Sequence, residues 1–542
     1  MYKPDLEIPL ARDRSWKYRL AEIFPGALSW FILALPLILA IISPVVSSFF
    51  VILYMVGWLI KAVVMIFRVL QGYKRMEQYS SMDWDYYLDD LSDDKYEALR
   101  RAEALQNTNF DSAHYHNLQI YFNQQNRIKP EEVVHAVIYP VYNESLETMR
   151  PSMEALEASE FDCKQIRLYM AYEERGGAKV EEDIKTLAKE YRNVFGDVQT
   201  IRHPVTPDEV LGKGGNINMA GRKLIEDMNK EKMDFDRVVV TTIDADNRVH
   251  RKYLSALTYF YSVSPNKKSL SYQPIPLYTN NVWDVPAPIR VASTGNSFYQ
   301  VIQSTRPHLM RNFSSHAQGL SGLVATGLWS ARTVVEDGHQ YWRSFVALKG
   351  EYDVIPLYVP IYQDAVLDNT FWKTFKAQFI QRRRWAYGCS DIPYFIQKWW
   401  QNRSELPFFR SFTRLVRRVE SEVSLATASL LLAFGGWAPF LVDRLIGDSE
   451  SIVALRMPGY AQVLRNLALV GIPISMYLAF KILPPRPDRY LKRRNLWMVL
   501  QWAWLPVAAL CFGSLAALNS QTRMMVGRYL EKFDVTAKHI KK

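Results

Sequence analysis

Hydrophobic positions are distributed unevenly along the chain: long uninterrupted runs lie towards both ends, and short β-branched runs lie in the middle. The first long run extends from Ala27 to about Phe67, and Pro44 interrupts it midway. Each half is close to the roughly 20 residues that a membrane-spanning helix needs. Three more apolar runs follow late in the chain, at about 423–442, 463–484 and 496–518. The pattern predicts membrane helices on both sides of a central domain.

Basic residues border the apolar runs, as is typical of cytoplasmic loops beside membrane helices. Arg68, Lys74 and Arg75 follow the first pair of runs, and the segment Arg486–Arg494 separates the last two. We expect the first pair to form a hairpin with both ends in the cytoplasm. Three simple crossings after the central domain would leave the C-terminal tail outside. A re-entrant or paired short segment would resolve this conflict, and Pro506 in the last run is compatible with one.

Charge and cysteine content narrow the functional classes. The 542 residues carry a formal net charge of +11, and Lys and Arg cluster beside the apolar runs rather than in a separate basic domain. We therefore expect contact with membrane lipids and not with nucleic acid. No small-residue cleavage site follows the basic N-terminal segment, so a removed signal peptide is not expected. The cysteines have neither metal-ligand spacing nor a disulfide framework: Cys163, Cys389 and Cys511.

The β-branched runs in the middle of the chain predict buried strands of an α/β sheet, at 133–139, 166–172, 237–243 and 354–360. Ligands of open α/β sheets bind at the carboxyl ends of such strands. Polar residues follow the first three strands at this position: Tyr142-Asn143-Glu144, Glu173-Glu174-Arg175 and Asp244-Ala245-Asp246. Between the second and third, Gly212-Lys213-Gly214-Gly215 opens a helix with a flexible loop and one cation, which can approach a phosphate closely.

Two carboxylates, Asp244 and Asp246, predict a metal site after the third strand. The alternation of side chains along a strand would place both on one side. Hard oxygen ligands suit Mg²⁺ or Mn²⁺, and a metal held by so few carboxylates completes its shell with substrate phosphates. The alternative interpretation, a single aspartate that caps a helix, does not account for both acids.

An apolar stripe at helical spacing leads into the basic segment Gln381–Trp385, and it consists of Phe371, Trp372, Phe375 and Phe379. The spacing predicts an amphipathic helix lying against a membrane. Three consecutive guanidiniums followed by an indole ring suit a diphosphate held next to a sugar acceptor. A basic membrane-surface helix is the alternative for this segment taken alone.

Taken in order, these motifs resemble those of membrane-integrated family 2 glycosyltransferases of the cellulose, hyaluronan and chitin synthase type. The resemblance covers about residues 133–390 and includes the acidic pair Glu336-Asp337 and the Gln-x-x-Arg-Trp pattern of Gln381–Trp385. The segment Phe533–Lys538 resembles the Phe-x-Val-Thr-x-Lys gating loop of that family. The resemblance implies an α/β fold of the GT-A type, a nucleotide-diphospho-sugar transferase domain inserted between N-terminal and C-terminal transmembrane helices.

The same resemblance implies a role for each matching residue. Asp337 would be the general base, and Asp244 and Asp246 would hold the metal. Contacts with the donor or acceptor would come from Tyr142, Glu144, Glu173, Lys213, Asp244, Gln381, Arg384 and Trp385, and from the tail residues Phe533, Thr536 and Lys538. The chain departs from the family at Glu173-Glu174-Arg175, where Asp-Asp-Gly is frequent, which bears on the preference for uridine. Asp364 competes with Asp337 as the base and is kept as an accessory residue.

The expected organisation has six segments. They are an N-terminal transmembrane hairpin (1–70), a helical linker (71–130), a cytosolic GT-A catalytic domain (131–390), interfacial amphipathic helices (391–422), a C-terminal transmembrane region (423–518) and a tail that resembles a gating loop (519–542).

These features predict an inverting, metal-dependent hexosyltransferase of the plasma (inner) membrane, with a cytoplasmic catalytic domain. The expected partners are a nucleotide sugar donor, with a UDP-sugar first, a carbohydrate or lipid acceptor, and membrane lipids. The leading hypothesis is processive extension of a polysaccharide. The alternative is single addition to a lipid or small acceptor, because the helices that follow the gating loop of cellulose synthases are not present after Lys538. A transport or scaffold protein with a dead transferase domain is disfavoured, since every acid of the motifs is present.

Overall fold

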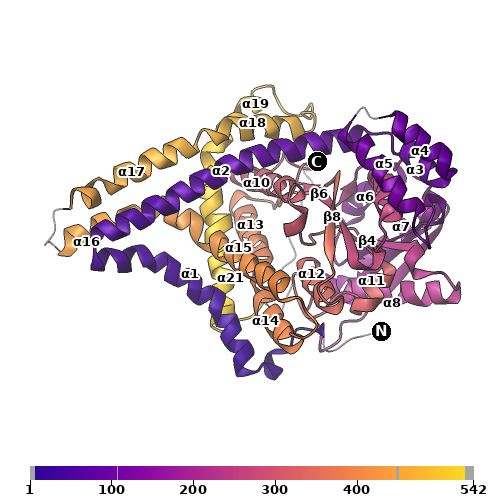
Figure 1. The fold of residues 1–542 in the computed structure, drawn as a ribbon, viewed down its shortest axis with the longest axis horizontal. Helices are drawn as coiled ribbons and strands as arrows, with labels where there is room; N and C mark the ends of the chain where they lie inside the picture. The colour runs from indigo at the N-terminus through magenta and orange to yellow at the C-terminus, as the bar shows by residue number, and fades with distance from the viewer. Residues whose placement is uncertain (1–5, 106–107, 447–450, 531–542) are drawn as a thin grey trace.

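The computed structural model of the chain describes residues 6–105, 108–446 and 451–530. Its centre is an eight-stranded mixed sheet with the order β3-β2-β1-β4-β7-β6-β8-β5 (Figure 1). The strands are β1 (Val134–Val141), β2 (Ile166–Glu173), β3 (Asp197–His203), β4 (Val238–Thr242), β5 (Arg248–Val249), β6 (Leu270–Leu277), β7 (Ala317–Gly319) and β8 (Asp353–Tyr362).

One half of the sheet is parallel, and β7 joins it to the other half. In the parallel half, β1 lies between β2 and β4, with Ile138 opposite Tyr169 on one side and Thr242 on the other. The short β7 is antiparallel to both β4 and β6, and β6 pairs with β8 in parallel. The carboxyl ends of β1, β2 and β4 therefore meet at one edge of the sheet, where ligands of α/β proteins bind.

The four strands expected from the β-branched runs are confirmed within two residues at each end. Four further strands were not predicted. Side chains of β3 are mostly partly exposed because this strand lies at the edge of the sheet, so its sequence lacks a continuous apolar run. The strand β6 contains Pro274 and Pro276, which interrupt the pattern of a central strand.

Helices pack on both faces of the sheet and close two hydrophobic cores. One core includes residues of α6 (Leu146–Glu157), α7 (Gly177–Tyr191) and α9 (Tyr253–Val263), and the other includes residues of α8 (Lys213–Lys230) and α11 (Leu320–Thr326). Two further helices carry site residues: α12 (Glu336–Ala347) and α13 (Phe371–Ala386). The α/β class predicted for the central domain is confirmed.

The described part of 71–122 is largely helical, as predicted, but it belongs to the core of the catalytic domain. They form the end of α2 (Pro44–Ser81), followed by α3 (Trp84–Ser92), α4 (Lys95–Ala104) and α5 (Asn109–Phe122). Trp84 is buried in the core beside α9, and His114 contacts both Asp90 (3.0 Å) and the Tyr259 hydroxyl (2.7 Å). The helix α2 has no break near residue 70, so the second apolar run and the start of this segment form one continuous helix.

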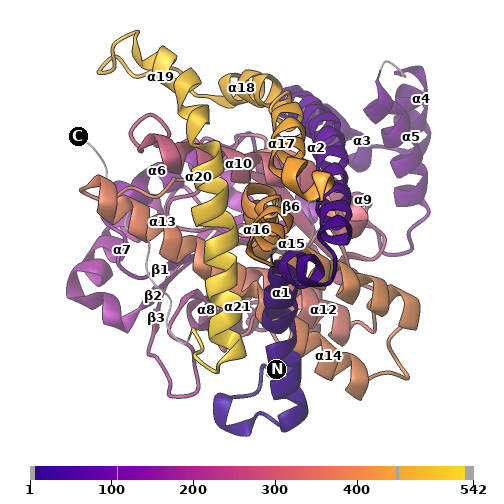
Figure 2. The ribbon, with the colours of Figure 1, turned by 90° about the vertical axis from the view of Figure 1, so that its left-hand side faces the viewer.

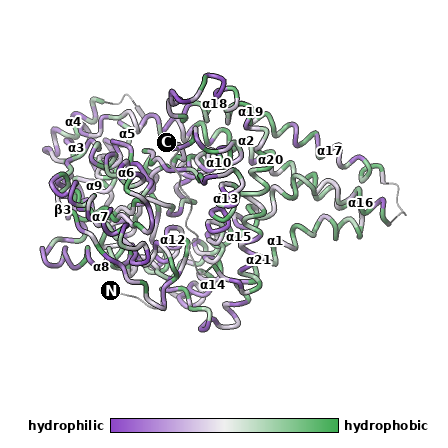
Figure 3. The backbone as a smooth tube through the Cα atoms, turned by 180° about the vertical axis from the view of Figure 1, so that it is seen from behind, coloured by the Kyte–Doolittle hydropathy of each residue, from purple (hydrophilic) through white to green (hydrophobic). Residues whose placement is uncertain are grey.

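Four helical segments are long and apolar enough to cross a membrane, counted over the three described ranges. They are α1 (Trp16–Ile42), α2, Ile452–Ile482 with α17 (Ile452–Ala468) and α18 (Gly471–Ile482), and Arg494–Met525. A fifth candidate is a pair bent by 57°, α15 (Phe408–Phe434) and α16 (Trp437–Ile446), which follows α14 (Asp391–Gln401). The helices α1, α2, α16 and α17 extend together away from the sheet (Figure 1), and hydrophobic residues colour most of this extension (Figure 3).

The last apolar segment runs in a different direction from the others. It consists of α19 (Arg494–Leu500), α20 (Leu505–Ala508), a π-helical stretch (Ala509–Leu515) and α21 (Ala516–Met525), and it crosses the other long helices at a steep angle in both views (Figures 1 and 2). Both of its ends contact the catalytic domain. At one end Arg494 donates to the Trp283 carbonyl (2.9 Å), and at the other Leu530 packs beside Val334. The segment can therefore begin and end on the same side of a membrane. This is the property that the re-entrant interpretation of the last run requires.

Candidate active site

One cavity of about 1120 Å³ collects the polar residues from the ends of the strands. It is lined by every predicted site residue that the structure describes: Tyr142, Glu144, Glu173, Lys213, Asp244, Asp246, Asp337, Gln381, Arg384 and Trp385, together with Asp364. The predicted tail residues Phe533, Thr536 and Lys538 lie outside the described residues. The residues expected to act together are thus gathered around one space, although they come from β2, α8, α12 and α13 and from the loops that follow β1, β4 and β8.

The end of the cavity at β1 and β2 carries Tyr142 and an ion pair. The Glu144 carboxylate accepts from the backbone N–H groups of Tyr142 (2.8 Å) and Asn143 (3.2 Å), so it holds the turn after β1. Glu173 is buried and pairs with Arg175, whose guanidinium carbon lies 5.0 Å from the centre of the Tyr142 ring. The face of Tyr142 that could stack on a base is therefore shared with a cation, a feature that the family pattern does not predict.

Lys213 is placed by close packing of the first turn of α8. A Cβ atom at Gly214 would lie 2.3 Å from the carbonyl oxygen of Ser330, so only glycine allows this approach. The Asn216 amide donates to the carbonyl oxygens of Val141 (2.9 Å) and Ala171 (3.2 Å) at the ends of β1 and β2. These contacts fix the helix N-terminus at the edge of the sheet and point its lysine into the cavity.

The Lys213 ammonium group lies among three carboxylates. Its Nζ atom is 2.8 Å from Asp244, 3.1 Å from Asp337 and 3.6 Å from Glu336. Burial by itself would lower the pKa of Lys213, but the facing carboxylates raise it above its ordinary value, so the group is charged. Burial, and then the charge of Asp337, raises the pKa of Glu336 to about 7. Three acids and one cation leave an excess of negative charge, which favours binding of a further cation.

Asp244 and Asp246 lie in a turn and not on a strand, which corrects the reasoning from strand alternation. The strand β4 ends at Thr242, and the Asn247 N–H donates to the Asp244 carbonyl (2.8 Å). Both carboxylates nevertheless face the cavity. The hydroxyl of Ser314 donates to Asp244, and the backbone N–H of Asp364 donates to Asp246 (3.1 Å). Asp364 therefore lies next to Asp246, one of the two carboxylates expected to bind the metal.

The helix α13 sends its basic side chains in different directions. The Arg382 guanidinium donates to the Phe512 carbonyl (3.0 Å) and to Asn296 (3.2 Å), whereas Arg384 donates to the Val334 carbonyl (3.2 Å). Gln381, Arg382, Arg384 and Trp385 line the cavity, and Arg383 does not. Successive helical residues are rotated by about 100° around the helix axis. Three adjacent guanidiniums therefore cannot bind one diphosphate together, and the interpretation of this segment from sequence was wrong on that point.

The apolar stripe of α13 packs partly against the last apolar segment. Phe375 contacts Phe512 with ring centroids 4.7 Å apart, while Trp372 is 75% exposed. One side of the helix therefore packs against the last apolar segment, and the exposed indole of Trp372 can contact another apolar surface. The amphipathic helix itself is confirmed, whereas its contact with a membrane stays a prediction.

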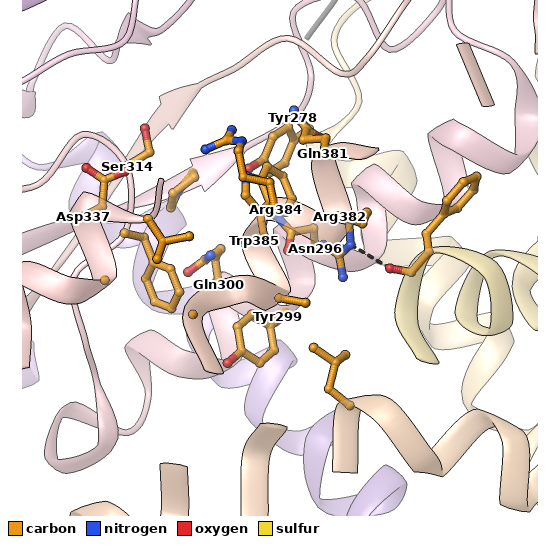
Figure 4. A pocket seen from close by; sticks show the side chains of 18 of the residues that line it. Tyr278, Asn296, Tyr299, Gln300, Ser314, Asp337, Gln381, Arg382, Arg384 and Trp385 are labelled. Atoms are coloured by element: carbon orange, nitrogen blue, oxygen red, sulfur yellow. Dashed lines mark hydrogen bonds between the residues drawn. The ribbon is translucent and has the colours of Figure 1, made fainter. Parts of the chain in front are cut away.

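Trp385 lines the cavity beside a second aromatic ring. Its ring lies 6.0 Å from that of Tyr278, and the Arg382 guanidinium lies 5.2 Å from its centre. Figure 4 shows these side chains together with Asn296, Tyr299 and Gln300 of α10 (Ala287–Ser304). Paired aromatic rings beside amide side chains form a surface that suits a sugar ring.

Four residues at the site were missed by the reasoning from sequence: Arg175 as a stacking partner, Ser314, Tyr278 and Asn296. None of them belongs to a recognisable motif. Ser314 follows no strand or glycine pattern, and Asn296 lies 86 residues before Arg382, its partner. Only Arg175 had a signal, because it lies in the segment that departs from the family pattern.

Comparison with known proteins identifies the family. The sequence pattern described as Glycosyl transferase family group 2 matches residues 239–527, which is more than half of the chain. The chain belongs to this family. A search of curated proteins gives no match.

Solved structures of glycosyltransferases resemble this family 2 member at low sequence identity. The mannosyltransferase PcManGT from Pyrobaculum calidifontis, in complex with GDP-Man and Mn²⁺, is 14% identical, with a TM-score of 0.40 over 76% of this chain and 97% of that one. TarS (residues 1–349) from S. aureus, in complex with UDP-GlcNAc, is 10% identical, with a TM-score of 0.30 over 64% of this chain and 92% of that one.

Membership of the family and the mixed sheet together establish the predicted class, a GT-A domain flanked by helices that are apolar enough to span a membrane. The protein is a glycosyltransferase.

The residues of this glycosyltransferase fit a divalent metal that binds together with the donor. No group of three or more His, Cys, Asp or Glu side chains with metal-binding geometry occurs within residues 6–105, 108–446 and 451–530. Asp244 and Asp246 supply hard carboxylate oxygens facing the cavity. Mg²⁺ is usually held by one or two carboxylates and by substrate phosphates, so two acids without a third protein ligand match this mode of binding.

Proposed function

We propose that the protein is an inverting glycosyltransferase that transfers a hexose from a nucleotide-diphosphate sugar to the end of a growing polysaccharide at the membrane. The observation that carries the proposal is a cavity that is lined by the expected metal acids, Lys213 and Asp337 together with Trp385, and that also reaches the apolar helices α2 and α15. Donor chemistry and an exit for the product are thus adjacent.

The donor would lie across the carboxyl ends of β1, β2 and β4. Tyr142 would stack on the base, and Glu173 would contact the nucleoside while holding Arg175. Lys213, Gln381 and Arg384 would bind the diphosphate. Asp244 and Asp246 would hold Mg²⁺ or Mn²⁺, which when bound neutralises charge on the diphosphate. A UDP-sugar is the proposed donor.

Asp337 would act on the acceptor. Its carboxylate takes the proton of the acceptor hydroxyl as that oxygen attacks the anomeric carbon, and the bond from this carbon to the diphosphate oxygen breaks. The configuration at carbon is inverted because attack and departure occur on opposite faces. The ammonium group of Lys213 lies 3.1 Å from Asp337. Its positive charge can stabilise negative charge on the leaving diphosphate or on the carboxylate of the base. The indole ring of Trp385 would stack on the acceptor sugar.

A polysaccharide is favoured as the acceptor because the cavity continues beyond Trp385 between α2, α10 and α15. Side chains that can hydrogen-bond to hydroxyl groups line this part: Asn296, Tyr299, Gln300, Gln303, Ser421 and Ser424. Transfer of one sugar to a lipid is the second candidate, supported by the apolar lining from Trp58, Val64 and Leu432. Polar and apolar side chains both line the cavity, and the polar ones along α10 would give a growing chain a row of hydrogen-bonding groups.

The protein would be a multi-pass protein of the plasma (inner) membrane with its catalytic domain in the cytoplasm. The basic segments beside the apolar runs support this orientation. Arg68 follows the apolar part of α2, and Arg489 and Arg494 contact the catalytic domain at Asp284 and Trp283.

The experiment is a donor panel with the purified protein in detergent. Nucleotide sugars are supplied one at a time with Mg²⁺ or Mn²⁺, and the released nucleoside diphosphate and the length of the carbohydrate product are measured. A product of many units supports processive synthesis, and a single addition to extracted lipid supports the second candidate. Absence of turnover with every donor would refute the proposal and restore a scaffold role.

A further inference from the structure

The membrane end of the cavity contains arginines whose charge is not used in the proposed transfer reaction. Arg68 of α2 and Arg306, two residues after the end of α10, line this end, and Arg311 lines it closer to α15. Arg68 is more than 200 residues away from Arg306 and Arg311 in the sequence. Such residues meet only through the fold, so the sequence gives no hint of the cluster.

The acid whose charge acts on Arg306 is Glu420, and it does so without forming a salt bridge with this arginine. Within the described parts of the chain no carboxylate forms a salt bridge with either guanidinium, and the nearby Glu420 pairs with Lys61. The Nε atom of Arg306 is buried without a hydrogen-bond partner. The pKa of Arg306 is lowered from its ordinary value, first by burial and then by the charge of Arg68. Both side chains are half-buried, and an anion between like-charged guanidiniums in such a place relieves their repulsion.

Carbohydrate-binding side chains connect the cluster to the acceptor site. Asn296 is bonded to Arg382 beside Trp385, and Arg306 lies ten residues further along the chain. At 1.5 Å per helical residue the separation is about 15 Å, a length that several linked sugars cover. Tyr299, Gln300 and Gln303 line the cavity in between, and Figure 4 shows the first two of these beside the Trp385 end.

We propose that Arg68 and Arg306 bind the anionic groups of an acidic polysaccharide, several units behind its growing end. The proposal rests on the proposed function and adds the chemical class of the product, a chain with carboxylate or similar anionic substituents. Guanidinium forks match carboxylates in geometry and hold them by two hydrogen bonds. Each added sugar would then bring a new anionic group to the cluster, which would hold the chain between successive additions.

A lipid phosphate is the competing occupant, because Arg68 lies where the apolar part of α2 ends. The observations favour the polysaccharide for two reasons. The cluster lies inside a cavity walled by α2, α10 and α15 rather than on an outer surface of these helices. Along α10 the path between Trp385 and the cluster is lined by amide and phenol groups, which can bind the hydroxyl groups of a carbohydrate.

The test is a binding titration that does not require turnover. Purified full-length protein in detergent is titrated with a hexamer of galacturonate, with an uncharged glucose hexamer of the same length, and with vesicles of phosphatidylglycerol or phosphatidylcholine. The proteins compared are the unsubstituted chain, Arg306→Gln, Arg68→Gln, and Arg403→Gln as a matched control, because Arg403 is exposed and lies outside the cavity. Thermal unfolding of each variant reports on its fold, and Arg68→Gln keeps the test decisive if Arg306→Gln does not fold.

We expect the galacturonate hexamer to bind more tightly than the glucose hexamer. Arg306→Gln and Arg68→Gln should each weaken its binding roughly tenfold, the effect of one charged hydrogen bond, and Arg403→Gln should not. Added salt should reduce the difference between the two hexamers. Equal affinity for both hexamers, or equal loss in the Arg403 control, would overturn the proposal. An effect of Arg68→Gln on binding to phosphatidylglycerol alone would overturn it in favour of a lipid phosphate.

The two levels of inference fail in different experiments. Absence of turnover in the donor panel, with selective binding of the acidic hexamer retained, would refute the transfer reaction but not the anion site. Processive synthesis of an uncharged polymer, without selectivity for the acidic hexamer, would refute the anion site and leave the transfer reaction standing.

Discussion

The substitution Asp337→Asn separates the general base from the groups that bind the donor. Asparagine has almost the volume of aspartate, and its amide oxygen can still accept from Lys213, which lies 3.1 Å from the present carboxylate. The contacts of Lys213 with Asp244 (2.8 Å) and Glu336 (3.6 Å) do not depend on this residue. The substitution therefore removes a proton acceptor and one negative charge, and leaves the cavity intact.

The expected loss of turnover is about 10²- to 10⁴-fold, the range for a positioned general base. At 1.36 kcal/mol for each factor of ten, the activation barrier rises by about 3–5 kcal/mol. Donor affinity should not fall, because one repulsive charge near the diphosphate is lost while Lys213 remains. The assay combines the rate of nucleoside diphosphate release with a calorimetric titration of the donor.

Asp364→Asn is the matched control, since Asp364 lines the same cavity and contacts Asp246 through its backbone N–H rather than its carboxylate (3.1 Å). We expect it to change turnover much less than Asp337→Asn. A large loss with Asp364→Asn and near-normal turnover with Asp337→Asn would show that the wrong acid has been assigned, and weaker donor binding by Asp337→Asn would contradict its role as a base.

Three further outcomes are expected. Turnover should stop in a chelator and return with added Mn²⁺, and Asp246→Asn should lower it at least 100-fold because charge on the leaving diphosphate loses its counter-ion; full activity in the chelator would exclude a metal. Glu336, with a pKa raised to about 7 from 4.5, keeps a proton in the folded protein that the unfolded chain releases. Its contribution to the free energy of unfolding is complete below about pH 4.5 and is lost as the pH rises through 7, so Glu336→Gln should flatten the fall of the thermal midpoint between about pH 5 and pH 8, and an unchanged fall would contradict this. Deletion from Phe533 onwards should lower turnover without preventing membrane insertion, and a single cysteine at Ala537 that reacts only from outside sealed vesicles would rule out gating.

The parts of the site that could be predicted from sequence are those in which neighbouring residues act together. Asp244 and Asp246 are two positions apart, and a continuous β-branched run precedes them, so both the acids and their place at the end of a strand were recognisable. The geometry was less certain: the acids lie in a turn because β4 ends at Thr242. The conclusion held because a turn at the end of a strand also faces the ligand-binding edge.

Contacts between distant segments could not be predicted. The approach of Lys213 to Asp337 joins positions 124 residues apart, and its effect on charge depends on burial, which no local pattern contains. The same holds for Arg68 and Arg306. The divergence of Arg382, Arg383 and Arg384 is different, since the rotation of a helix already excludes a common direction, and the sequence interpretation gave too much weight to the composition of that segment.

The position of the chain near its C-terminus connects membrane topology to the active site. Tyr529 donates to Glu22 of α1 (2.9 Å) and lies under the Arg14 guanidinium, 3.9 Å from the ring centre. The next residue, Leu530, packs in the cluster that contains Val334 and Val335, directly before the acidic pair. These contacts hold the start of the tail on the side of the catalytic domain, because the residues that anchor it belong to that domain or to the first turns of α1.

This anchoring bears on the conflict between the number of apolar runs and the proposed gating loop. The motif that resembles a gating loop begins three residues after Leu530, so an extended chain allows Phe533 a reach of about 10 Å from the loop that precedes Asp337. A tail on the opposite side of a membrane could not satisfy this constraint. The segment Arg494–Met525 meets the catalytic domain at both ends, and it is therefore the run that can leave the tail on the catalytic side. Its π-helical stretch after Pro506 lies against α15. There the Ser429 hydroxyl donates to the Ala509 carbonyl oxygen (3.2 Å), and the Ser514 hydroxyl donates to the Leu425 carbonyl oxygen (3.1 Å). The last apolar segment can therefore lie along the domain without leaving these carbonyl groups unpaired.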